Sequence, residues 1–185
     1  MSATDRLLAN YARQVDLPWS ENLSGKQRVW FAVYPPAEER RVRAHLPQFE
    51  VLTLAAKHDW FTVDLTRLLP EWISTHEYRE DFFAEPELFS SSSKLEDLAV
   101  RLIRQACEAE GTDSRSVLAL TGLASLFDFI RVSSVVERVE DSVRGRLLVF
   151  FPGEYAGNVY RFMDARDGFN YMAVPITSAE SFLLP

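Results

Sequence analysis

Residues 146–155 read Arg-Leu-Leu-Val-Phe-Phe-Pro-Gly-Glu-Tyr and decide the fold. The residues from Leu147 to Phe151 form an unbroken apolar run, which the turn-forming pair Pro152-Gly153 ends. A short apolar run without polar alternation is typical of a strand that is covered on both faces, as in a parallel sheet. This stretch therefore predicts a buried strand in an α/β protein.

Working outward, similar apolar runs alternate with helical patterns. Strands that alternate with helices predict a mainly parallel sheet between two helical layers, a Rossmann-like three-layer α/β/α sandwich. The predicted strands are 28–34, 60–65, 117–120 and 146–151, with weaker ones at 159–163 and 171–176. The predicted helices are 2–15, 36–46, 68–72, 93–110 and a valine-rich helix over 132–139.

Three local signals refine these bounds. Ser2 with Asp5, and Ser93 with Glu96, have the spacing of a capping box, and Asp128 is the expected cap of the valine-rich helix. Pro47 is expected to end the second helix. The segment 49–54 reads as a further strand, or 49–65 as a strand, a turn and a hairpin partner, and pattern alone does not separate these.

Composition bounds the class of protein. The chain has 185 residues, 47% hydrophobic and 25% charged, as expected for one globular domain over residues 1–185. Its net charge of −7 argues against direct DNA binding along a phosphate backbone, although a basic cluster at Arg40–Arg43 is present. Cys107 stands alone, so no internal disulfide or paired-cysteine zinc site is expected, and a buried inert thiol is the simplest reading.

The expected localisation rests on two features that the sequence does not show, a secretion signal and a membrane-spanning run. The start, Met1 to Arg6, does not have the basic-then-apolar order of a secretion signal. The longest nearly apolar run, Val117 to Ile130, is shorter than the roughly 20 residues that span a bilayer. We therefore expect a cytoplasmic protein without a membrane segment.

The common catalytic motifs are absent. The fragment Ser24-Gly25-Lys26-Gln27 lacks the first glycine and the hydroxyl of a phosphate-binding loop, and no Gly-x-Gly occurs. The stretch Gly122-Leu123-Ala124-Ser125 does not have the Gly-x-Ser-x-Gly spacing of the nucleophile elbow of serine hydrolases. His45, His58 and His76 show no metal-binding spacing, so no metal or cofactor is predicted.

The best candidate site is an edge of the sheet. The carboxyl ends of parallel strands share one edge, where ligands usually bind. Three predicted strands end there, and Arg131 follows shortly after the second. The candidate residues are Tyr34, Thr121, Gly122, Arg131, Pro152, Gly153, Glu154 and Tyr155.

Arg131 lies in an otherwise apolar stretch, so its guanidinium is expected to be buried and to need an anion. Asp128 or Glu154 could pair with it internally, or it could contact an anion or a phosphopeptide, and the two readings are equal. Asp64 and Glu154 could hold magnesium in a phosphoesterase or nuclease, against the simpler reading that both bond to local backbone groups.

The segment 77–89 interleaves acids with aromatic side chains. It reads either as a crossing segment that covers the core or as a mobile flap that docks a basic partner.

The carboxyl half resembles the BrxB family of BREX bacteriophage-exclusion systems, most specifically over 117–176. The resemblance rests on two blocks and on Asn170-Tyr171. The blocks are Thr121-Gly122-Leu123-Ala124-Ser125-Leu126-Phe127-Asp128-Phe129-Ile130-Arg131-Val132 with Val136-Glu137-Arg138, and Leu147-Leu148-Val149-Phe150-Phe151-Pro152-Gly153-Glu154-Tyr155. Ala156, Met172 and Ala173 depart from the family pattern.

The resemblance implies a role in antiphage defence without an assigned active site. It implies a small assembly or adaptor subunit that contacts a PglZ-type protein, with the BREX methyltransferase and ATPase as other partners. The alternatives from other classes are the metal-dependent enzyme above and a degenerate nucleotide-sensing domain.

Overall fold

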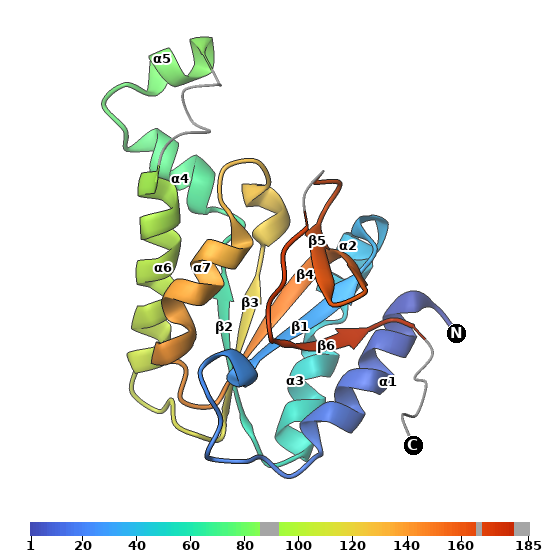
Figure 1. Cartoon of the computed structure of the whole chain (residues 1–185). Coiled ribbons are helices and arrows are strands. Elements are labelled where there is room, and N and C mark those ends of the chain that lie inside the picture. Colours follow the sequence, from blue (N-terminus) through green and yellow to red (C-terminus); the bar gives the residue numbers. More distant parts are fainter. Residues whose placement is uncertain (86–92, 166–167, 180–185) are drawn as a thin grey trace.

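The computed structural model describes residues 1–85, 93–165 and 168–179, and its centre is a six-stranded sheet (Figure 1). The strand order is β2-β3-β4-β1-β6, every pair in this order is parallel, and β5 pairs antiparallel with the far end of β4. The predicted α/β class with a mainly parallel sheet is confirmed. The strands are β1 (Val29–Tyr34), β2 (Asp59–Asp64), β3 (Ser116–Thr121), β4 (Arg146–Ala156), β5 (Val159–Phe162) and β6 (Val174–Thr177).

The central strands are apolar throughout because they serve two cores. Successive side chains of a strand point to opposite faces. Phe31 and Phe151 therefore join one core, and Trp30 and Phe150 join the other. Both faces of β1 are buried along its whole length.

Helices cover both faces of the sheet (Figure 1). The first core is closed by α4 (Leu68–Ser74), α6 (Ser93–Glu108) and α7 (Val132–Val139). The second core is closed by α1 (Ala3–Val15), α2 (Glu39–Ala44) and α3 (Leu46–Ala55). The short α5 (Arg79–Ala84) lies apart from both layers. Single 3₁₀ turns occupy η1 (Lys26–Arg28), η2 (Pro36–Glu38), η4 (Leu123–Leu126) and η5 (Glu140–Ser142).

The strand predicted over 49–54 is wrong, because these residues belong to α3. Pro47 does not end a helix. It lies in the first turn of α3, where a backbone N–H has no partner within the helix, so the missing N–H of proline breaks no hydrogen bond. Phe49 and Thr53, four residues apart, are buried, whereas Val51 and Leu54 point to solvent. The apolar run therefore concealed a helix with one buried face.

Of the three expected caps, one is confirmed. The Ser2 side chain accepts from the Asp5 N–H, and Asp5 accepts from the Ser2 N–H. Ser93 is the first residue within α6, so it is not the residue that precedes the helix. Asp128 does not cap α7; Arg131 precedes that helix, and Asp128 takes a left-handed backbone with φ of 68°.

The remaining predicted elements agree closely with the structure or fall partly outside it. The strands expected over 159–163 and 171–176 are β5 and β6, which are shorter. Residues 86–89, the end of the acidic-aromatic segment, lie outside the described residues, as does the tail 181–185. Across the described ranges, no helix combines the length and hydropathy that crossing a bilayer requires.

Phe151 tests the packing between the layers. It is fully buried, and its ring centroid lies 5.2 Å from that of Phe31 and 5.3 Å from that of Phe162. We expect Phe151→Ala to lower the free energy of unfolding by about 3–5 kcal/mol, because it leaves a cavity in the first core. The exposed Val51→Ala, measured beside it by urea denaturation, should change stability by less than about 0.5 kcal/mol. Equal losses in the two variants would contradict this packing.

Candidate functional site

The predicted edge exists, and the sheet register brings its residues together. Tyr34 ends β1 and is the Cα partner of Pro152 in β4. Thr121 ends β3 and is the partner of Asp64 at the end of β2. The loops after β1 and β4 leave toward opposite faces, since Val42 after β1 joins the second core and Tyr160 after β4 joins the first. Such a divergence is where ligands bind in open parallel sheets.

Most of the candidate residues are nevertheless covered. Those buried in the described structure are Tyr34, Thr121, Gly122, Pro152 and Gly153. Arg131 and Glu154 are exposed, and Tyr155 is half-buried. A partner at this edge would therefore touch Arg131, Glu154 and Tyr155, while the buried residues shape the backbone beneath them.

The structure shows a polar cluster at this edge that the sequence did not predict, in which Arg43 and Thr66 contact Asp64. The Asp64 carboxylate accepts from the Thr66 N–H at 2.9 Å and pairs with the Arg43 guanidinium at 3.3 Å. Arg43 also donates to the Thr66 hydroxyl at 2.8 Å. The spacing Asp-x-Thr is a known turn signal and could have found Thr66, but no local pattern links α2 to the end of β2.

The environment of Asp64 favours its ionised form. Burial raises the pKa of this carboxyl, but the hydrogen bonds from Thr66 and the charge of Arg43 outweigh burial and hold the pKa below its usual value. The Asp64 oxygens are thus engaged with the local backbone and a neighbouring cation.

Tyr34 serves as a neutral donor. Its hydroxyl donates to the Glu39 carboxylate at 2.6 Å. Burial, followed by the Glu39 charge, raises the pKa of the phenol far above its ordinary value, so it stays protonated. The bond ties the end of β1 to α2 across the edge.

Arg131 does not occupy the environment that its sequence context predicted. The side chain is exposed, and its backbone N–H donates to Glu96 at 3.2 Å. Glu96 also accepts from the Ser134 hydroxyl and lies 3.5 Å from Arg138. Glu96 therefore fastens α6 to the start of α7. The prediction of a buried guanidinium is wrong: Arg131 precedes α7 and is exposed, although Ile130 and Val132 on either side of it are buried.

Glu154 and Tyr155 lie on the hairpin of β4 and β5. Glu154 pairs with Arg161 across the strands at 3.9 Å, and both side chains are largely exposed. The Tyr155 hydroxyl donates to Asn158 at 3.0 Å, and its ring centroid lies 4.6 Å from that of Tyr160. This hairpin extends β4 beyond the residues that pair with β1.

Metal-binding groups do not gather in the described part of the chain. It contains no cluster of three or more His, Cys, Asp or Glu side chains that could hold an ion. The three histidines lie on different elements: His45 between α2 and α3, His58 before β2, and His76 between α4 and α5. Burial raises the pKa of the Cys107 thiol to about 11, so this buried side chain stays a neutral thiol.

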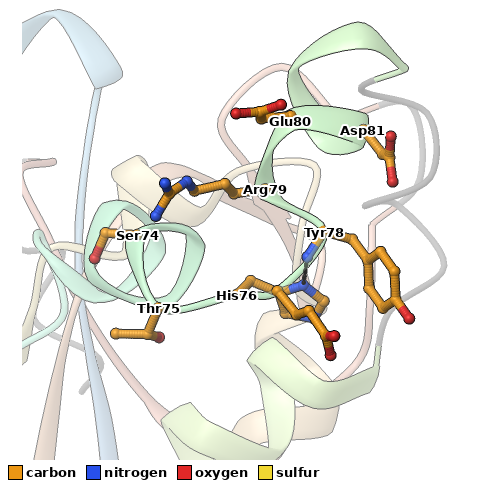
Figure 2. A pocket seen from close by; sticks show the side chains of 8 residues that line it. Ser74, Thr75, His76, Tyr78, Arg79, Glu80 and Asp81 are labelled. Carbon is orange, nitrogen blue, oxygen red and sulfur yellow. Dashed lines mark hydrogen bonds between the residues drawn. The ribbon is translucent and has the colours of Figure 1, made fainter.

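Residues 75–85 form an arm, which contains the turn after α4 and the helix α5 and carries the described part of the acidic-aromatic segment. After α4 the chain turns at His76, whose Nδ1 accepts from the Tyr78 N–H at 3.3 Å, and then forms α5 (Figure 2). Arg79 points back toward the turn at Ser74, while Glu80 and Asp81 lie on α5 (Figure 2). These residues line an open hollow of about 520 Å³. In Figure 1 the arm extends beyond the carboxyl edge of the sheet.

A comparison with known protein families identifies the chain. The family model described as BREX protein BrxB matches residues 61–176. This range is more than half of the chain and contains the stretch 117–176 on which the resemblance rested, so the chain belongs to the BrxB family. Neither the curated proteins nor the solved structures contain a match to it.

Gly122 tests the close packing at the edge. It has φ of +82°, and a Cβ there would lie 2.4 Å from the Thr66 backbone nitrogen. Gly157 has φ of +57° and open space around it. We expect Gly157→Ala to cost about 1 kcal/mol, the cost of a left-handed backbone alone, and Gly122→Ala to cost clearly more. Thermal unfolding of both variants measures the difference, and similar losses would refute the steric argument.

Asp64 tests the electrostatics of the same cluster. A carboxyl whose folded pKa lies below its unfolded pKa stabilises the fold above the unfolded value, near 4, and loses this effect as the pH falls through the folded value. We expect Asp64→Asn to lower stability at pH 7 by less than about 1 kcal/mol, because the side chain is half exposed.

The difference should shrink below about pH 4, where the wild-type carboxyl also becomes neutral. Urea denaturation from pH 7 to pH 3 measures it, with the exposed Asp16→Asn as the control for losing one negative charge. A loss that stays constant across this range would mean that the charge of Asp64 contributes nothing.

Proposed function

We propose that this BrxB family member is an assembly subunit of its BREX antiphage system and contacts the PglZ-type protein through the carboxyl end of its sheet. Family membership makes the chain a component of a BREX system. The adaptor role and the choice of partner are our inference. The arm that carries α5 is the observation on which this proposal rests.

The arm is built as a segment that gains stability from a partner. The helix α5 has six residues, fewer than an isolated helix needs to be stable in water. The side chains of Arg79, Glu80 and Asp81 are exposed, and so is the ring of Tyr78, at 58%. An exposed aromatic ring on a projecting segment is a typical anchor in protein interfaces.

The charge of the arm indicates the kind of surface that it fits. Between residues 77 and 85 the acids Glu77, Glu80, Asp81 and Glu85 outnumber the basic Arg79. A partner with a basic surface would be attracted to this segment and oriented by it. The proposed contact is therefore a basic groove on the PglZ-type protein.

The rest of the interface follows from the position of the arm. Arg131 follows β3 and the Glu154-Tyr155 hairpin continues β4, so both come after the carboxyl-terminal parts of parallel strands, and the side chains of Arg131 and Glu154 are exposed. We include them in the interface, with Tyr34, Thr121, Gly122, Pro152 and Gly153 as the buried support beneath. The methyltransferase and the ATPase of the same system are the next partners to test.

The test is co-expression with the PglZ-type protein of the same operon, followed by affinity capture and size-exclusion chromatography. We expect co-elution in a fixed ratio for the wild type. The charge reversal Glu80→Lys with Asp81→Lys should weaken capture at least tenfold, because it opposes a basic surface. Arg131→Ala with Glu154→Ala should weaken it further when combined with the reversal.

The matched control is Glu50→Lys with Glu110→Lys, which changes the net charge equally at exposed sites on α3 and after α6. If the control loses capture as strongly as the arm variant, the effect is one of net charge and the arm is not the contact. Full assembly with Arg131→Ala and Glu154→Ala removes that pair from the interface. Separate elution of the wild-type proteins rejects the PglZ-type partner.

A further inference from the structure

A second site lies at the opposite, amino-terminal edge of the sheet. A cavity of about 290 Å³ is lined there by Arg28, Arg115, Arg144 and Arg146, with Trp19 and His58. These residues come from the segments that immediately precede β1, β2, β3 and β4 or begin them. Parallel pairing therefore gathers four arginines from three segments that are far apart in sequence.

Arg146 is the innermost of these cations. It is the first residue of β4 and is only 4% exposed. Its guanidinium donates to the carbonyl oxygens of Gly145 at 3.0 Å and Ser20 at 3.3 Å, and it lies 4.5 Å from the centre of the Trp19 ring. Burial, followed by the nearby charge of Arg28, lowers the pKa of Arg146 to about 10. A buried cation held by neutral groups is costly.

The charges around the cavity do not balance. Arg115 pairs with Asp59 and Asp113. None of the ion pairs between described residues involves Arg28, Arg144 or Arg146, and both outer arginines donate to backbone carbonyls instead. Among the lining residues the acid is Glu21. With Asp59 and Asp113 counted beside Glu21, the four arginines face three acids, which leaves an excess of one positive charge, and Arg28, Arg144 and Arg146 have no carboxylate partner among the described residues.

Two buried polar atoms at the cavity also lack hydrogen-bond partners within the described residues. The rings of Trp19 and His58 stack with centroids 3.6 Å apart. Within the described ranges, Trp19 Nε1 and His58 Nδ1 are buried and have no hydrogen-bond partner. Buried polar groups are nearly always hydrogen-bonded, so unsatisfied ones at a cavity point to a missing acceptor or water.

We propose that this amino-edge cavity binds the phosphate group of a small molecule. A phosphate monoester is an anion with three acceptor oxygens at neutral pH, which matches the forked donors of the three arginines without a carboxylate partner and the two unsatisfied ring nitrogens. A monocarboxylate offers only two acceptor oxygens to these donors. The volume is at the lower end for ligand pockets, which suits a small anionic group.

The site is independent of the proposed assembly role, because it lies at the other edge of the sheet. The experiment titrates the purified full chain with inorganic phosphate at constant ionic strength, set with sodium chloride. We expect the melting temperature to rise with phosphate concentration, as for a ligand that binds the folded state, and calorimetry to give one site per chain. Adenosine 5′-monophosphate and adenosine form parallel arms that distinguish a nucleotide from free phosphate.

The test variant is Arg28→Gln with Arg144→Gln, which leaves the buried Arg146 in place. It should weaken phosphate binding at least tenfold while circular dichroism shows an unchanged fold. Arg67→Gln with Arg161→Gln removes the same charge at the opposite edge and should bind as the wild type does. Phosphate should also change the tryptophan fluorescence of the wild type, and Trp19→Phe should lose that change.

A melting temperature that responds to phosphate no more than to sodium chloride would overturn the proposal. Equal binding by both double variants would overturn it too. Binding of a phosphoserine peptide without binding of phosphate or nucleotide would assign the cavity to a protein partner and reject the small molecule.

Discussion

The pairing of β1 with β4 is the constraint on which the rest of the structure depends. Both strands are buried on both faces, so neither can present a side chain to solvent along its apolar length. Two helical layers must cover them, and each layer closes its own core. Polar chemistry is consequently confined to the two ends of the sheet, where the strands enter and leave.

The two ends satisfy their polar groups differently. At the carboxyl end the groups partner one another: Asp64 with Thr66 and Arg43, and Tyr34 with Glu39. Such a closed network rigidifies the edge and leaves contact to the projecting arm and hairpin. At the amino end Arg28, Arg144 and Arg146 rely on backbone carbonyls and, for Arg146, aromatic faces, which supply no negative charge. An external anion would complete the second end, whereas the first end is already complete.

The sequence was most informative where burial alone decides the structure. The strands predicted at 28–34, 117–120 and 146–151 correspond to β1, β3 and β4, whose apolar runs reflect burial of both faces. The same reasoning failed at 49–54, since Phe49 and Thr53 face inward on a helix whose outer side is also apolar. It failed for Arg131 because an exposed turn interrupts an apolar stretch. The edge residues could be predicted from topology, but Arg43 and the amino-edge arginines could not, because their proximity depends on strand order.

Net charge is a poor guide to such local sites, and β4 shows why the two ends can act separately. The strand begins with Arg146 at the cationic cavity and carries Glu154 near its other end, where it pairs with β5. Along a straight strand, eight residues at about 3.3 Å each span roughly 26 Å. The screening length at physiological salt is about 8 Å, so exposed charges at one end do not sense those at the other. Any coupling between anion and partner would therefore have to pass through a displacement of β4 itself, and a strand packed on both faces resists displacement. If both proposals hold, the burial that holds the sheet together predicts that the two ends bind independently of each other.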